Sequence, residues 1–309
     1  MRCLCLCIVA LCISSTLGAG IEKYFKKIKH KTDMHKMDGI DFIYMINLDE
    51  RPEKFAICKQ QLDRYEIYPY RFSAVNGWKL PFNCFRHLGV KYSPEMASLC
   101  TGLWGTTYDF NDGKLHDELI ALPGRCYFCR GMGCSHIGIV LSHLSCLQDA
   151  YDSGYKTIWV MEDDINVIRN PHLVSEAIEK LDKLVGQDGW DILFTDQDTK
   201  DRNGTHVICL SYARRPNFTP EHPERFAERQ IINPEFRKIG ARYGAYSMII
   251  RRSGIKKLLN FFKNYKIFLP YDMDYFLPNN LHIFTVVDDI VSVLPKALSD
   301  NRAPNYERK

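Results

Sequence analysis

Three consecutive acidic residues follow a short apolar run near the middle of the chain. Residues 158–161 are apolar, and Glu162, Asp163 and Asp164 come directly after them. Three adjacent carboxylates repel one another and lose hydration at the mouth of a buried strand, so a positive partner is expected beside them. Their hard oxygen ligands suit Mg²⁺ or Mn²⁺, ions that can also bind the phosphates of a nucleotide. The alternative is a solvated acidic turn.

The sequence on either side of these acids predicts alternating helices and strands. Apolar residues recur at helical spacing over residues 137–151, and a Ser-Gly pair at residues 153–154 ends this pattern. A second helix is predicted to begin at the Asn-Pro pair of residues 170–171, followed by an apolar strand at residues 192–194. In an open α/β sheet, ligands bind beyond the carboxyl ends of the strands, which is where the acids lie.

Six short sequence blocks occur in an order that one enzyme family shares. They are INLDER at residues 46–51, FSAVNG at 72–77, GIVLSH at 138–143, YGAY with a later SG at 243–254, LPYD at 269–272 and SD at 299–300. With the acids between them, these blocks resemble glycosyltransferase family 25, the lipopolysaccharide and collagen β-galactosyltransferases. Ile139 stands where the family usually has Cys. The resemblance covers the chain from about residue 42 to residue 300.

This resemblance implies a fold, a donor and a reaction. The fold would be α/β, a single GT-A-like nucleotide-binding domain with a mostly parallel central sheet flanked by helices. The donor would be a UDP-sugar bound with Mn²⁺ or Mg²⁺. The enzyme would transfer a hexose, galactose being expected, with inversion. The acceptor would be a glycan, a lipid-linked saccharide or a protein hydroxyl.

The turn after the first predicted strand would lie at the ligand edge. Residues 42–48 form an apolar, β-prone run, and Pro52 marks the start of the next helix. By the resemblance, Asn47 and Asp49 would hydrogen-bond the base or ribose of the donor, and Arg51 would meet a phosphate. The alternative is that Asp49 caps the helix and Arg51 is solvated.

A second contact loop is expected at residues 74–77. Ala74, Asn76 and Gly77 belong to the FSAVNG block, and the resemblance implies that they help to bind the nucleotide. Gly77 is expected to adopt a positive φ, which glycine tolerates without strain. An ordinary turn is the alternative.

The reaction that the resemblance implies requires two carboxylate functions. A metal held by Asp164, with help from Glu162 or Asp163, would neutralise the charge that develops on the departing diphosphate. A second carboxylate would take the proton from the attacking acceptor hydroxyl, and Asp272 in the LPYD block is the expected base. Asp274 and Asp196 are the other candidates. Each of the three can instead be a helix cap or a surface acid.

Two histidines lie on nearly the same face of the helix that is predicted to begin near residue 136 and to run to residue 151. His143 belongs to the GIVLSH block, and His136 lies seven residues earlier. A lone helical histidine is more often a packed, hydrogen-bonded residue than a catalytic one. The block match favours His143 as a residue of the active site.

Residues 78–130 show no clear period and are interpreted as an insertion over the acceptor side. Cys126-x-x-Cys129, followed by Cys134 and His136, invites a structural zinc site, although zinc modules usually place ligands in two separated pairs. Disulfides in an exported domain, or free thiols, are the alternatives.

The loop over residues 197–238 is long and polar. Its arginines include Arg202, Arg214, Arg215, Arg225 and Arg229. The loop is interpreted as a mobile lid, an acceptor platform or a decorated surface loop.

The composition fits one large core. The chain has 309 residues, of which 46% are hydrophobic. Its net charge is +4 and the basic residues after residue 40 are scattered, so no nucleic-acid partner is expected. We assign residues 41–300 to a glycosyltransferase domain, 21–40 to a basic linker and 301–309 to a tail.

The first twenty residues have the character of a leader. Residues 3–19 are mostly apolar and end in small residues, as in a signal peptide. Five lysines between residues 23 and 31 resist translocation, so the segment is alternatively an uncleaved membrane anchor. The protein is therefore expected to be membrane-associated, on either side of the membrane, or else exported or in the lumen of the endoplasmic reticulum.

Two other classes of function could use the same residues. A metal-dependent phosphohydrolase of nucleotide sugars would need the acids at residues 162–164. A catalytically silent carbohydrate-binding protein would keep the fold alone. The presence of both the acids and Asp272 favours the transferase.

Overall fold

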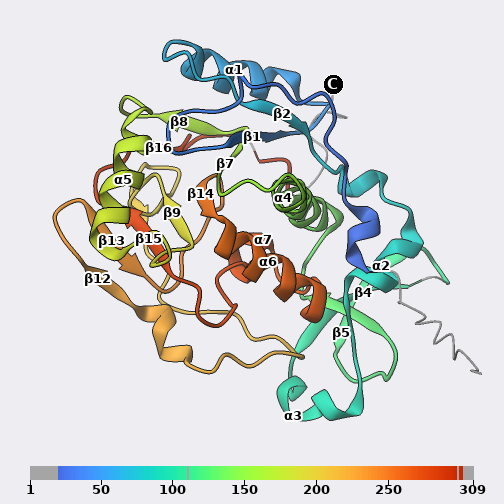
Figure 1. The fold of residues 1–309 in the computed structure, drawn as a ribbon. Helices are drawn as coiled ribbons and strands as arrows, with labels where there is room; N and C mark the ends of the chain where they lie inside the picture. The colour runs from blue at the N-terminus through green and yellow to red at the C-terminus, as the bar shows by residue number, and fades with distance from the viewer. Residues whose placement is uncertain (1–19, 110, 298, 302–309) are drawn as a thin grey trace, which may run out of the picture.

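The fold is built on an eight-stranded sheet with helices on both faces (Figure 1). The computed structural model describes residues 20–109, 111–297 and 299–301. The expected leader up to residue 19 and the expected tail from residue 302 lie outside the described residues. In spatial order the strands are β12 (Arg229–Ile231), β13 (Phe236–Ile239), β15 (Ile283–Val286), β9 (Ile192–Phe194), β14 (Ser247–Arg251), β7 (Thr157–Glu162), β1 (Phe42–Asn47) and β2 (Tyr70–Ser73).

This sheet is mixed, so the prediction of a mostly parallel sheet is wrong. Three of its seven neighbouring strand pairs are parallel, and four are antiparallel. Parallel pairing is confined to β2, β1 and β7 on one side and to β15 and β9 on the other. Strand β14 runs antiparallel to both its neighbours, β7 and β9.

The register brings several strand ends to one edge. Ile46 near the end of β1 pairs with Glu162 at the end of β7. Ser247, the first residue of the antiparallel β14, pairs with Met161. The residues that follow β1 and β7 and those that precede β14 therefore meet at the same edge of the sheet.

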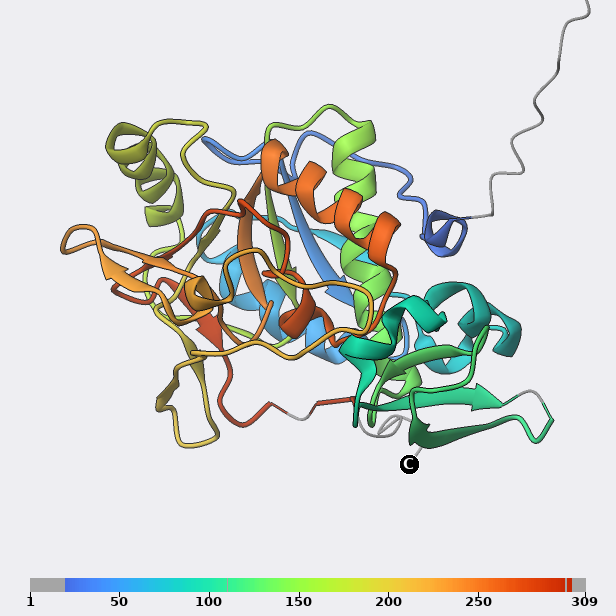
Figure 2. The same cartoon turned by 90° about the horizontal axis from the view of Figure 1, so that it is seen from below.

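Four helices cover the two faces of the sheet. Helices α4 (Cys134–Asp152) and α6 (Arg252–Tyr265) contribute to one hydrophobic core, and α1 (Pro52–Asp63) and α5 (Leu173–Val185) to the other. Successive residues of β1 alternate between these cores, as the pleat of a strand requires. Figure 2 shows α4 and α6 side by side. The predicted helices and apolar strands around the acids are confirmed.

Residues 78–130 form a lobe with a sheet of its own. Its antiparallel strands are, in order, β3 (Val90–Lys91), β6 (Cys126–Cys129), β4 (Trp104–Asp109) and β5 (Lys114–Leu119). Short helices surround them: η2 (Gly77–Lys79), η3 (Phe82–Cys84), α2 (Phe85–Leu88), η4 (Pro94–Met96) and α3 (Ala97–Cys100). The eight cysteines of the described residues, here and elsewhere, are free thiols.

The basic segment 21–40 packs along the body of the protein. It begins with η1 (Ile21–Tyr24), in which Ile21 is buried. Lys31 Nζ lies 2.9 Å from an oxygen of Asp149 on α4, and Lys26 Nζ donates to the carbonyl of Ala74. The segment expected to be a linker is therefore fastened to the domain. In the part of the chain that the structure describes, no helix is long and apolar enough to cross a membrane.

Arginines fasten the loop over residues 197–238 to the body. Arg215 is buried against Asp274, Arg225 donates to the carbonyls of residues 276–278, and Arg229 donates to the carbonyl of Ala241. These contacts favour an anchored loop over a freely moving one. The loop contains β10 (Thr199–Lys200), β11 (His206–Val207) and η5 (Pro223–Ala227). The remaining short elements of the domain are β8 (Ile165–Val167), α7 (Tyr271–Asp274) and β16 (Val291–Val293).

Candidate functional site

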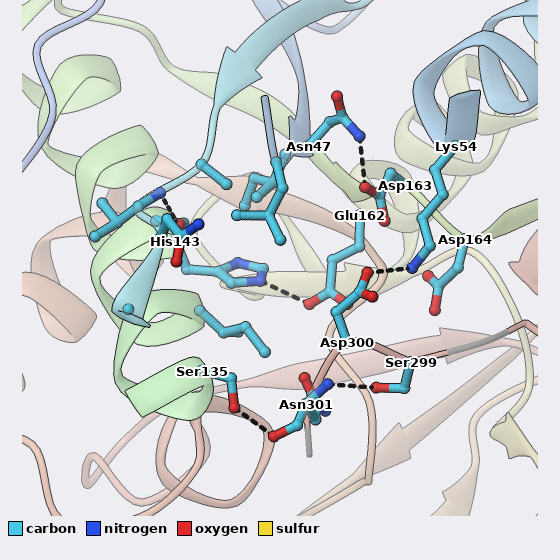
Figure 3. Close-up of a pocket in the computed structure, with 18 of the residues that line it drawn as sticks. Asn47, Lys54, Ser135, His143, Glu162, Asp163, Asp164, Ser299, Asp300 and Asn301 are labelled. Atoms are coloured by element: carbon cyan, nitrogen blue, oxygen red, sulfur yellow. Dashed lines mark hydrogen bonds and ion pairs between the residues drawn. The ribbon is translucent and has the colours of Figure 1, made fainter. Parts of the chain in front are cut away.

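A cavity of about 150 Å³ lies at the edge where β1 and β7 end (Figure 3). Its walls come from the turn after β1, the loop after β2, helix α4, the acids after β7 and the C-terminal segment. The polar and charged residues that line this first cavity are Asn47, Lys54, Asn76, Ser135, Ser142, His143, Glu162, Asp163, Asp164, Ser299, Asp300 and Asn301.

Of the three residues predicted in the turn after β1, Asn47 alone lines the first cavity. Its amide nitrogen donates to Asp163 Oδ2 at 2.6 Å, and its amide oxygen accepts from Arg71. Asn47 therefore holds the turn and an acid in place. Asp49 is exposed and accepts from Ser73 rather than capping α1.

Arg51 is not solvated. Its side chain is 12% exposed and pairs with Glu53 and with Asp300. It thus lies behind the wall of the first cavity, joined to it through Asp300.

The predicted loop at residues 74–77 lines the first cavity. Asn76 accepts from the backbone of Trp78 and so caps η2. Gly77 does not have the expected positive φ. A Cβ at Gly77 would lie 1.8 Å from the carbonyl oxygen of Cys134, and a Cβ at Gly138 on α4 would lie 2.5 Å from the carbonyl oxygen of Val75 in the loop. The two glycines let the loop and α4 touch.

Of the three consecutive acids, two have side-chain partners in the wall of the cavity (Figure 3). Glu162 Oε1 lies 2.8 Å from Nε2 of His143, and Asp163 accepts from Asn47. Asp164 Oδ1 is buried and has no hydrogen-bond partner within the described residues. Across residues 20–109, 111–297 and 299–301, no group of three His, Cys, Asp or Glu side chains is arranged to hold a metal ion. For Cys126, Cys129 and Cys134 this leaves the free thiols, one of the three alternatives, while the binding of a metal by the acids stays a prediction.

The electrostatics of the acids are unusual. Burial raises the pKa of Asp163 to about 6, against the opposing charge of Lys54 and the hydrogen bond from Asn47. Burial, and then the charges of Glu162 and Asp163, raise the pKa of Asp164 to about 7. The first cavity therefore resists holding all its carboxylates in charged form.

His143 lies in the wall of the first cavity. It is buried in the middle of α4, and its ring stacks on Tyr271 with a centroid distance of 4.1 Å. This stacking fixes the ring, and the ring fixes Glu162. His136 lies instead at the start of α4, where its Nδ1 accepts from the backbone of Gly133 at 3.3 Å.

A second cavity, of about 100 Å³, adjoins the first. Ile139, Glu162 and Asn301 line both of them, so Glu162 lies in a common wall. Asp272 lines the second cavity and accepts from the backbone of Gly244 at 3.2 Å. Burial raises the pKa of Asp272 above its usual range, the Gly244 hydrogen bond acting against it.

The other two acids proposed as bases lie in buried ion pairs. Asp274 and Arg215 are fully buried against each other. Asp196 lies 2.8 Å from Arg242 and accepts from the Tyr246 hydroxyl. Neither acid lines the two cavities. They are not surface acids, because both side chains are fully buried, and the N-cap of α7 is Pro270 rather than Asp274.

Sequence reasoning missed Lys54 and gave no role to the residues after 298. Lys54 lies in the first turn of α1, which begins at Pro52. A lysine in the first turn of a helix that starts at the ligand edge of a sheet could have been recognised from the sequence as a candidate phosphate-binding residue. Asp300 pairs with Lys54 and Arg51, and the carbonyl of Asn301 accepts from Ser135. The Ser-Asp block at 299–300 was recognised, yet nothing in its composition told which wall it would join.

Comparison with known proteins identifies the family. The sequence model of Glycosyltransferase family 25 (LPS biosynthesis protein) matches residues 40–277. A protein of Aedes aegypti named Glycosyltransferase 25 family member is 27% identical over 175 residues, which is 57% of this chain and 24% of that protein. A protein of the same name from Drosophila melanogaster is 24% identical over 171 residues, or 55% of this chain and 23% of that protein. The chain thus spans about a quarter of the length of these relatives.

The family model covers the turn after β1, the loop after β2, helix α4, the acids and Asp272, but not residues 299–301, which also line the first cavity. The chain belongs to glycosyltransferase family 25.

Proposed function

We propose that this protein transfers a hexose, galactose being expected, from a UDP-sugar to a hydroxyl of a glycan, a lipid-linked saccharide or a protein. The donor would occupy the first cavity and the acceptor hydroxyl would enter through the second. One observation carries this proposal: the two cavities share a wall at Glu162, with three further carboxylates in the first cavity and the carboxylate of Asp272 in the second. The mixed sheet with its site at the ends of β1 and β7 would correspond to the GT-A kind of fold.

The charge of the first cavity supports a divalent cation. Four carboxylates, those of residues 162–164 and of Asp300, face it together with Lys54. A diphosphate would be repelled by such a site unless Mn²⁺ or Mg²⁺ accompanied it. The residues fit this cation because Asp164 Oδ1 is buried without a partner among the described residues and the pKa values of Asp163 and Asp164 are raised. Asp164 would hold the ion with help from Asp163, and the ion would offset charge on the leaving diphosphate.

Asp272 is the proposed base. It lies in the second cavity, across the common wall from the acids. Its raised pKa makes it a better proton acceptor than an ordinary carboxylate. In the proposed reaction the acceptor hydroxyl gives its proton to Asp272 while its oxygen attacks the sugar from the face opposite the diphosphate, which inverts the sugar.

The nucleotide would lie between the turn after β1 and the loop at residues 74–77. Asn47 would hold the turn, with Asp49 and Arg51 flanking it, and the loop would present its backbone and Asn76 to the base or ribose. No nucleic-acid partner is proposed.

We propose that residues 1–20 act as a signal peptide or as a membrane anchor. If they anchor the protein, the full-length chain should sediment with membranes at its full mass. A soluble product that begins near residue 20 would instead support export.

The proposed function is tested by incubating the protein with a panel of UDP-sugars, Mn²⁺ and simple saccharide or hydroxylysine acceptors. Chromatography of the nucleotide products separates the possibilities. Release of UDP with a new glycoside is the expected result. Release of UMP or phosphate without an acceptor would identify a phosphohydrolase, and binding without any turnover would identify a silent carbohydrate-binding protein.

A further inference from the structure

Two cations at the start of α1 share one carboxylate of the C-terminal segment. Lys54 Nζ lies 2.8 Å from Asp300 Oδ2, and Arg51 pairs with the other carboxylate oxygen. The three side chains are 12–14% exposed, so the cluster lies below the surface. Lys54 and Asp300 both line the first cavity (Figure 3). Asp300 is therefore an anion from the protein itself, held by Lys54 in the cavity wall and by Arg51 from behind that wall.

The position of Asp300 is unfavourable in the absence of those cations. It adds a fourth carboxylate to a cavity that already has the three acids of residues 162–164, and its charge helps to raise the pKa of Asp163. Lys54 is the only lysine or arginine among the described residues that line the first cavity. The cation best placed to meet an incoming anion is thus already paired with a carboxylate.

We propose that Lys54 and Arg51 form the subsite for the diphosphate of the donor, and that Asp300 occupies this subsite until the donor displaces it. This inference rests on the proposed function, because it requires a nucleotide diphosphate in the first cavity. A phosphate group brings more charge and more acceptor oxygens than a carboxylate, and lysine and arginine bind it strongly. The diphosphate would therefore exchange with Asp300 for the two cations.

Such an exchange reduces the apparent affinity for the donor. The protein binds the diphosphate only in the fraction of molecules in which Asp300 has left the cations, and the dissociation constant rises in inverse proportion to that fraction. Asp300 would in this way keep the charges of Lys54 and Arg51 paired when no donor is bound. It would also favour ligands with enough negative charge to replace it.

The test is calorimetric titration of the full chain with UDP and with uridine, in Mn²⁺ and again in EDTA. Asp300→Asn should bind UDP more tightly, by roughly threefold to tenfold. Lys54→Gln should bind UDP more weakly, by about tenfold or more, a change of the size expected for one lost charged contact. Uridine lacks the diphosphate, so its affinity should be the same in all variants.

Helix α1 offers matched controls. Lys59 and Asp63 form an ion pair of the same type on the outer part of this helix, away from both cavities. Lys59→Gln and Asp63→Asn should bind UDP as the parent does. In the double variant Lys54→Gln with Asp300→Asn, the gain from removing Asp300 should shrink, because its main partner is gone.

Each contrary result has a distinct meaning. Weaker UDP binding by Asp300→Asn in Mn²⁺ alone would show that Asp300 helps to hold the cation, and would overturn the inference. Unchanged binding by Asp300→Asn or Lys54→Gln would overturn it while leaving the proposed function intact. A parent protein that binds no UDP in either condition would overturn the inference and the nucleotide-donor function together.

Discussion

The Glu162 carboxylate lies 2.8 Å from Nε2 of His143, and this contact joins the last residue of β7 to the middle of α4. His143 is itself stacked on Tyr271, which is the residue before Asp272. The acids of the first cavity and the proposed base of the second are thus linked through one histidine. The arrangement suggests that His143 sets the orientation of the common wall.

We therefore expect His143→Phe to reduce sugar transfer by about 10-fold to 100-fold, the usual effect of losing a residue that orients a functional carboxylate. The aromatic ring keeps the stacking on Tyr271 but cannot hydrogen-bond Glu162. Steady-state kinetics should show the loss with little change in melting temperature. His116→Phe, a change on the exposed strand β5 of the lobe, is the control and should keep full activity. Full activity of His143→Phe would remove the orienting role.

Stability without metal should fall as the pH rises from about 4 to about 8. In the folded state the pKa values of Asp163 and Asp164 lie near 6 and 7, above those of free carboxyls, so the folded state binds more protons in this range. Raising the pH ionises both carboxyl groups inside the cavity, and the folded state then loses the stabilisation that came from binding those protons. Melting temperatures of the parent protein and of Asp164→Asn should be recorded across this pH range in EDTA. The melting temperature of the variant should depend less on pH than that of the parent. Identical profiles would contradict the prediction.

The ion pair between Asp274 and Arg215 should be structural. Because both side chains are fully buried, Asp274→Asn would leave the guanidinium of Arg215 without its charge partner. We expect a loss of about 3–5 kcal/mol in the free energy of unfolding, measured by urea denaturation. Asp33→Asn, at an exposed pair with Lys36, should leave stability unchanged. A stable Asp274→Asn variant that fails only in transfer would return Asp274 to the list of candidate bases.

The contact between α4 and the loop at residues 74–77 predicts a reversal of the usual helix preference. Glycine to alanine inside a helix ordinarily stabilises by about 1 kcal/mol. At Gly138, however, a Cβ would lie 2.5 Å from the carbonyl oxygen of Val75, so Gly138→Ala should destabilise by roughly 1–3 kcal/mol and weaken UDP binding. Gly133→Ala, at the N-cap of α4, has room because the atom nearest to the added Cβ is 3.9 Å away; it is the control for crowding and should show only the loss that alanine causes at an N-cap. Denaturation and UDP titration of both variants check this prediction. Equal stability and equal UDP affinity of Gly138→Ala and Gly133→Ala would contradict it.

Much of the scaffold could be predicted from the sequence because it depends on local patterns. The apolar run that ends at Asn47, the proline that begins α1 and the helical stripe of α4 are each encoded within one segment. The same patterns placed the acids at the end of β7. They say nothing of strand direction, and therefore the antiparallel insertion of β14 between β7 and β9 was not predicted.

The parts of the site that were missed depend on contacts between distant segments. Asp274 looks like a free acid in a turn until Arg215, from the long loop, is brought against it. Gly77 looks like a turn glycine until Cys134 on α4 is seen to leave no room for a Cβ. Asp300 joins the cavity only because Arg51 and Lys54, near the start of the chain, lie beside it. No periodicity within a single segment carries this information.

The central claim is that the donor lies in the first cavity while Asp272, across the common wall, deprotonates the acceptor. It is tested most directly by measuring sugar transfer and UDP affinity together in Asp272→Asn. The amide is nearly isosteric, so we predict that transfer falls by about 10²-fold to 10⁴-fold, the range for loss of a general base, while the dissociation constant for UDP barely changes. Normal transfer by Asp272→Asn, or a loss of UDP binding as large as the loss of transfer, would contradict the account.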